Sequence, residues 1–144
     1  MKAAVITGFV LAGFLATRAD AQAPEPGKVI GRWSGSGSLF DTTLAKRVGP
    51  IPIALTMESD QSGAGQLGNA SLTVTRFTAG RGLIEVRADL SGAPAADRAL
   101  AKRRLVLLVT SATDSTLHAE FHLKSNFIFD PTMREGRVLL TRVR

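Results

Sequence analysis

The sequence contains no cysteine and no tyrosine, and it has one tryptophan and two histidines. Without cysteine there is no disulfide, no thiol nucleophile and no site for lipid attachment after the N-terminal apolar run. A Gly-x-Ser-x-Gly elbow is also absent, and both histidines fall on one predicted strand. These absences leave little basis for nucleophilic catalysis and favour a non-enzymatic protein.

Long hydrophobic runs are equally scarce. The longest apolar segment near the N-terminus, Ala3–Leu15, follows Lys2 and precedes small-x-small cleavage motifs. It is too short to cross a bilayer, which needs about 20 residues, so it predicts a secretory signal cleaved after Ala21. We expect a periplasmic or secreted product with a disordered, proline-containing leader over residues 22–28 and a single domain over 29–144.

The charge balance is modestly basic, with 18 Lys and Arg against 12 Asp and Glu and a net charge of +6. We interpret this excess as a solubility feature, with binding of anionic partners as the alternative. The basic clusters Lys102–Arg104, with Arg98, and Lys46–Arg47 lack the interleaved aromatic residues of nucleic-acid proteins. The sequence therefore predicts no nucleic-acid partner and contact with a membrane only through the cleaved signal peptide, and it leaves the oligomeric state open.

Apolar residues mostly alternate with polar ones after Val29, the pattern of antiparallel strands with one buried face. Turn-rich stretches separate these runs, and only Ala93–Arg104 has a helical pattern. We predict an all-β protein, a small antiparallel up-and-down barrel of seven or eight strands with one short helix near residues 94–103. Closing the sheet would remove the edges that a disulfide-free exported protein must protect.

Gly63, Gly65 and Gly68 form a literal G-x-G-x-x-G, and Asp89 lies 21 residues further on. A dinucleotide site needs a helix that begins within this motif, but strand-forming residues follow it. We interpret the motif as a glycine-rich hairpin loop and predict no cofactor.

His118, Glu120 and His122 share one face of a strand and are the candidate catalytic or metal-binding residues. Strand residues four apart are separated by roughly 13 Å, whereas metal–ligand bonds are about 2 Å long, so both imidazoles can hardly reach one ion. We predict no metal site and interpret the three as a polar strand face. Carboxylates such as Glu58 with Asp60, or Glu85 with a neighbouring arginine, are weaker acid–base candidates.

Inward apolar side chains are the candidate lining of a ligand cavity. Phe127 and Phe129 have the same strand parity, and an alternating strand precedes them. The predicted ligand-binding residues are Leu55, Met57, Phe121, Phe127 and Phe129. The alternative is that they form an ordinary packed core.

Trp33 lies in the stretch GRWSGSGSLF, where it shares one strand face with Gly35, Gly37 and Leu39. Inward glycines permit sharp coiling, close approach of a neighbouring strand, or space for a guest. The triplet Gly31–Trp33 resembles the G-x-W signature that opens strand one of lipocalins and their calycin relatives. This resemblance implies a closed eight-stranded barrel, a ligand mouth opposite Trp33, and a basic residue, here Arg142, packed over the indole.

Three functions follow as hypotheses. The first is an exported bacterial envelope protein that binds a small apolar or amphipathic molecule inside the barrel. The second is a small barrel enzyme, such as an isomerase, cyclase or hydrolase, that uses His118, Glu120 or His122. The third is an interaction or inhibitor module that acts through loops, notably residues 40–50 and 62–69. The face that lines the interior discriminates between them.

Overall fold

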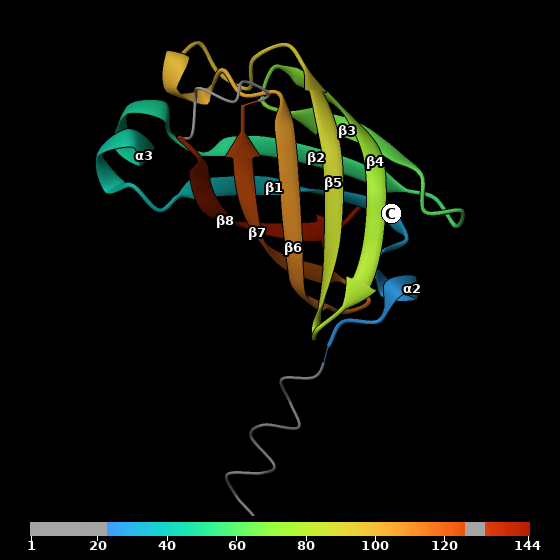
Figure 1. The fold of residues 1–144 in the computed structure, drawn as a ribbon. Coiled ribbons are helices and arrows are strands. Elements are labelled where there is room, and N and C mark those ends of the chain that lie inside the picture. The colour runs from blue at the N-terminus through green and yellow to red at the C-terminus, as the bar shows by residue number, and fades with distance from the viewer. Residues whose placement is uncertain (1–22, 126–131) are drawn as a thin grey trace, which may run out of the picture.

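The chain folds into a closed antiparallel barrel in which each strand pairs with the next and β8 pairs with β1 (Figure 1). The computed structural model describes residues 23–125 and 132–144. The strands are β1 (Gly31–Leu39), β2 (Ile51–Met57), β3 (Gly63–Leu67), β4 (Ala70–Gly80), β5 (Leu83–Ser91), β6 (Arg104–Ala112), β7 (Thr116–Lys124) and β8 (Arg134–Arg142). The helical elements are α2 (Pro26–Val29), α3 (Thr42–Val48) and the 3-10 turn η1 (Arg98–Leu100). The predicted fold class is confirmed.

Apolar side chains fill the barrel from every strand because the alternation in the sequence is kept through all the registers. Leu55 lies opposite Trp33, and Phe121 lies opposite Leu107. These four side chains are at most 2% exposed. A guest-sized cavity would leave its lining accessible, so the described inward side chains form a packed core.

Phe121 occupies the space that two inward glycines provide. A Cβ built on Gly37 would lie 2.8 Å from the Phe121 ring, and one built on Gly136 would lie 2.5 Å from it. Real Cβ atoms do not approach so closely, so a side chain at either position would displace the ring. In the described structure the β1 glycine Gly37 therefore makes room for a neighbouring aromatic side chain.

One end of the barrel is closed around Trp33. The indole Nε1 donates a hydrogen bond to the Val29 carbonyl of α2 at 2.9 Å, and the guanidinium of Arg142 lies 4.3 Å from the ring centroid. Arg142 also donates to the carbonyl oxygens of Ile30, Lys28 and Asp114 at 2.7–3.0 Å. The segment before β1, the end of β8 and the β6–β7 turn thus meet at one side chain.

The opposite end carries α3 and η1, which bury Leu44 and Leu100. Asp97 joins the two elements, because its carboxylate bonds Arg47 Nε of α3 at 2.5 Å and accepts the Ala99 amide of η1 at 2.9 Å. Figure 1 shows α3 and the connection that contains η1 at this end of the barrel.

Asp97 makes the connection between α3 and η1 sensitive to acid. The hydrogen bond from Arg47, followed by that from Ala99, lowers the pKa of the Asp97 carboxyl below its ordinary value of 3.8. A lowered folded-state pKa stabilises the fold above the unfolded-state pKa, and this contribution disappears as pH falls through the folded-state pKa. We expect Asp97→Asn to lower the melting temperature at pH 7. The difference from the unaltered protein should begin to narrow near the unfolded-state pKa of about 4 and shrink further as pH falls. Thermal unfolding of both proteins from pH 7 to pH 2.5 measures this, and a gap that persists unchanged at pH 2.5 contradicts it.

Three local predictions need correction. The leader predicted to be disordered over 22–28 contributes Pro26–Gly27–Lys28 to α2, since proline is tolerated in a first helical turn. The helix predicted near 94–103 shrinks to Arg98–Leu100. The glycine-rich loop is instead strand β3, and a Cβ on Gly65 would lie 1.9 Å from the Ala54 carbonyl oxygen of β2, so glycine allows the strands to approach.

No helix within residues 23–125 and 132–144 has both the length and the apolar character that a bilayer-spanning helix requires.

Candidate functional site: a cationic depression on the outer wall

The histidine face lies on the outside of the barrel. His118, Glu120 and His122 point outward, because the β7 residues that alternate with them are buried. These buried residues are Leu117, Ala119, Phe121 and Leu123. His122 Nδ1 lies 3.2 Å from a carboxylate oxygen of Glu135, and its buried Nε2 has no hydrogen-bond partner in the described part of the chain. The residues that the structure describes contain no group of three His, Asp or Glu side chains able to hold a metal ion. The geometry gives the three candidates no shared catalytic or metal-binding centre.

The predicted ligand-binding residues divide into two groups. Leu55, Met57 and Phe121 belong to the packed core, where each is at most 2% exposed. Phe127 and Phe129 lie outside the described residues. The described core residues therefore face one another and leave no open cavity between them.

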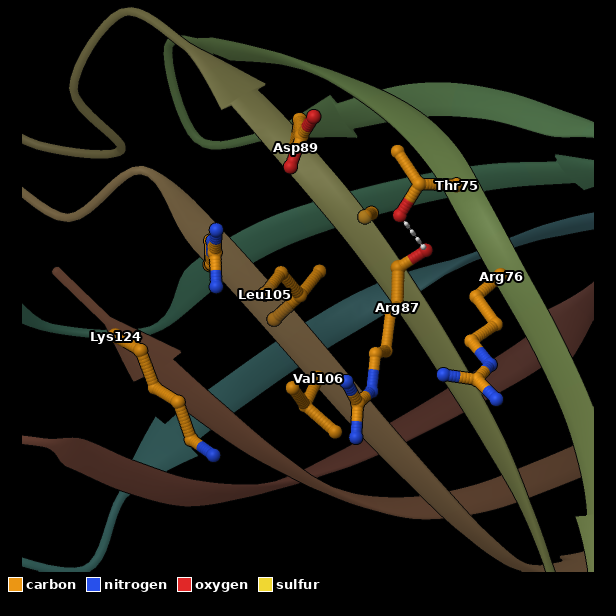
Figure 2. A pocket seen from close by; sticks show the side chains of 9 residues that line it. Thr75, Arg76, Arg87, Asp89, Leu105, Val106 and Lys124 are labelled. Atoms are coloured by element: carbon orange, nitrogen blue, oxygen red, sulfur yellow. Dashed lines mark hydrogen bonds between the residues drawn. The ribbon is translucent and has the colours of Figure 1, made fainter. Parts of the chain in front are cut away.

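A depression of about 410 Å³ lies on the outer wall, across β4 to β7 (Figure 2). Its charged lining consists of four cations and one carboxylate: Arg76, Arg87, Arg104, Lys124 and Asp89. Val106 pairs with Arg87 of β5 and with His122 of β7. In Figure 2 its side chain lies between those of Arg87 and Lys124 and supplies an apolar surface among the cations. The depression thus combines a cationic rim with an apolar floor.

Strand registers explain why these cations gather. Arg76 of β4 pairs with Arg87 of β5, and Arg87 pairs in turn with Val106 of β6. Arg104 of β6 lies directly opposite Lys124 of β7. Cross-strand neighbours on one face are about 5 Å apart at Cβ, so adjacent like charges raise the energy of the sheet unless anions compensate them.

The protein provides part of that compensation, because Asp89 of β5 lies opposite Arg104 of β6. Arg87 is paired with Glu85 of the same strand. Within residues 23–125 and 132–144, Arg76, Arg104 and Lys124 make no side-chain hydrogen bond or ion pair, and all three are exposed. Clustered cations on a hollowed surface focus a positive potential and concentrate anions there.

The β4 bulge helps to shape this surface. The β4–β5 register shifts between Val74 and Arg76, and the extra residue, Thr75, donates a hydrogen bond from its hydroxyl to the Arg87 carbonyl oxygen at 3.4 Å. Bulges re-aim side chains and commonly lie beside functional sites. Here the shift is what places two arginines opposite each other on the outer face.

The sequence pattern does not predict this depression. The helical pattern of Ala93–Arg104 would place Arg104 at the end of a helix, whereas this residue begins β6. Lys102 of the same cluster is buried and donates to the Thr132 hydroxyl at 3.0 Å. Alternation alone places Arg87 and Lys124 on outward faces, but bringing them together requires the registers and the bulge.

Comparison with protein-family models, curated proteins and solved structures found no match. Evidence for the function therefore comes from the residues of the site.

Proposed function

We propose that this chain is an exported, non-catalytic binding protein of the bacterial envelope that holds an anionic, amphipathic molecule on its outer wall. The observation that carries the proposal is the trio Arg76, Arg104 and Lys124, which border one depression and make no ion pair within residues 23–125 and 132–144. Asp89, opposite Arg104 in the β5–β6 register, is the one carboxylate in the lining. A phosphate, sulfate or carboxylate group would bind the cations, and an apolar portion would cover Val106. Charge-assisted hydrogen bonds to such groups are each worth about 1.5–3 kcal/mol.

The interior carrier function remains a prediction. For it to operate, Leu55, Met57 and Phe121 would have to separate, because each is almost completely buried against its neighbours. The outer depression requires no such rearrangement. This difference favours the outer wall as the binding surface.

Dodecyl phosphate below its micelle concentration is a suitable probe, with dodecyl maltoside as its uncharged counterpart. We expect the phosphate to shift amide resonances of β4–β7 and the maltoside to shift them weakly. The double variant Arg104→Gln/Lys124→Gln should bind the phosphate at least tenfold more weakly, since two charge-assisted contacts are removed.

A matched control removes the same total charge elsewhere. Lys46→Gln/Arg98→Gln alters two exposed cations outside the depression. This variant should bind dodecyl phosphate within about twofold of the unaltered protein, allowing for the loss of long-range attraction. Equal weakening by both double variants would mean that net charge, and not the depression, attracts the anion.

A further inference from the structure

Strand β4 continues past the strand that covers its outer edge. β3 pairs only with Ala70–Thr73 of β4, while β4 runs on to Gly80. Its remaining portion pairs with β5 alone, from Arg76 opposite Arg87 to Gly80 opposite Leu83. Among residues 23–125 and 132–144, no strand pairs with the other side of Arg76–Gly80, which we name the β4 free edge. Figure 1 shows this part of β4 beside β5, below the point where β3 begins.

The turn after β4 reveals which backbone groups face outward. Arg81 and Gly82 have φ of 55° and 79°, the signature of a two-residue type I′ hairpin turn closed by Gly80 and Leu83. Hydrogen-bonded and non-hydrogen-bonded pairs alternate along an antiparallel ladder. Thr78 therefore bonds with β5, whereas Phe77 and Ala79 direct their N–H and C=O groups away from it.

These four groups, which point away from β5 in the plane of the sheet, have no backbone partner among the described residues. Such a row of donors and acceptors is the template for strand addition, in which an extended peptide continues the sheet. The bulge at Thr75 ends the template on the side of β3. The template is thus short and has defined limits.

The charges at the β4 free edge select the partner. Arg76 and Arg81 stand at its two ends and are both exposed. A second copy paired antiparallel would bring the Arg76 end of one edge to the Arg81 end of the other, which places like charges together. Acidic side chains on a heterologous strand would be attracted to both arginines.

We propose that the β4 free edge docks an extended, acidic segment of a partner protein by strand addition. The proposal is separate from the anionic-ligand function, although Arg76 borders both surfaces. The main-chain groups of Phe77 and Ala79 supply the hydrogen bonds, and the flanking arginines supply selectivity.

Ala79→Pro is the discriminating variant. It deletes an outward N–H that makes no bond to β5, and proline is tolerated on edge strands where the N–H faces solvent. Ala79→Val is the matched control because it keeps the N–H and favours a strand. The probes are a ten-residue peptide of alternating glutamate and valine, and the same peptide with lysine in place of glutamate.

We expect the glutamate peptide to bind the unaltered protein and Ala79→Val alike, measured by fluorescence anisotropy of the labelled peptide. Ala79→Pro should bind it at least tenfold more weakly, and the lysine peptide should bind the unaltered protein at least tenfold more weakly. Equal binding by Ala79→Pro, equal binding of the two peptides, or dimerisation of the protein through this edge would overturn the proposal. Dodecyl phosphate binding should be the same for Ala79→Pro and Ala79→Val, which separates this test from that of the outer-wall ligand.

Amide hydrogen exchange tests the same proposal without a variant. In the unaltered protein alone, the amides of Phe77 and Ala79 should exchange fast, while that of Thr78 is protected by β5. The glutamate peptide should slow exchange at Phe77 and Ala79 at least tenfold and leave Thr78 nearly unchanged. Absence of added protection at millimolar peptide would refute strand addition.

Discussion

Replacing Phe121 by alanine is expected to lower the free energy of unfolding by about 3–5 kcal/mol. The ring is 2% exposed and fills the space beside Gly37 and Gly136. Both neighbours are glycines without side chains, so the wall cannot easily collapse into the space that the ring leaves. Urea unfolding followed by circular dichroism measures the loss.

Phe40→Ala is the matched control for this change, because Phe40 is 44% exposed. It makes one cation–π contact with Arg137, whose guanidinium lies 5.5 Å from the ring centroid, so about 1 kcal/mol or less should be lost. A cost for Phe121→Ala as small as that for Phe40→Ala would show that the barrel centre has room to spare. That outcome would strengthen the interior carrier hypothesis at the expense of the outer-wall function.

Replacing Arg142 by alanine is expected to lower the free energy of unfolding by about 2–4 kcal/mol. The change removes the cation from Trp33 and leaves the carbonyl oxygens of Lys28, Ile30 and Asp114 without their donor. A cation–π contact contributes about 0.5–2 kcal/mol, and each hydrogen bond to a charged donor contributes a further amount that water partly replaces. Thermal and urea unfolding of the variant provide the measurement.

Arg142→Lys separates charge from geometry at this position. Lysine keeps the positive charge but lacks the planar fork that reaches three carbonyl oxygens from one stacked group. It should recover less than half of the stability lost in Arg142→Ala. Full recovery by lysine would mean that the charge alone acts on Trp33 and that the hydrogen bonds contribute nothing measurable.

The strands were predictable because each carries one buried face, and burial imposes a period of two on the sequence. β5 illustrates this, since Ile84, Val86, Ala88 and Leu90 are all buried. The order of the strands follows from short connections between antiparallel neighbours. Arg142 pairs with Trp33 across β8 and β1 and packs over its ring, as predicted for these two residues. The lipocalin resemblance itself stays a prediction.

The sequence contains a local signal for helix α3, although residues 40–50 are expected to form a loop. The Asp41 side chain accepts the Leu44 amide at 3.0 Å as an N-cap, and Gly49, with φ of 76°, ends the helix. An acidic cap and a terminating glycine eight residues apart are visible in the sequence.

The helix predicted near residues 94–103 is reduced to η1 by tertiary contacts. Its alanines and arginines favour a helix, but the chain must bury Leu100, reach Arg47 through Asp97 and bury Lys102. These tertiary contacts outweigh an intrinsic preference of less than 1 kcal/mol per residue. Local composition contains no information about them.

The outer depression and the β4 free edge are properties of pairs of strands. The depression depends on the bulge beside Arg76. The β4 free edge depends on that bulge and on the difference in length between β3 and β4. A sequence pattern gives the parity of each strand but not its offset from its neighbour. Such sites become visible only when the registers are known.

The single tryptophan has a practical consequence. Trp33 is 1% exposed, and the chain has no tyrosine, so intrinsic emission excited at 295 nm originates from one indole at one end of the barrel. Its wavelength will report whether water reaches that end and will be nearly silent to events at α3, η1 or the outer wall. A comparison of this signal with circular dichroism during unfolding would therefore reveal whether the barrel opens at its tryptophan end before its strand structure is lost.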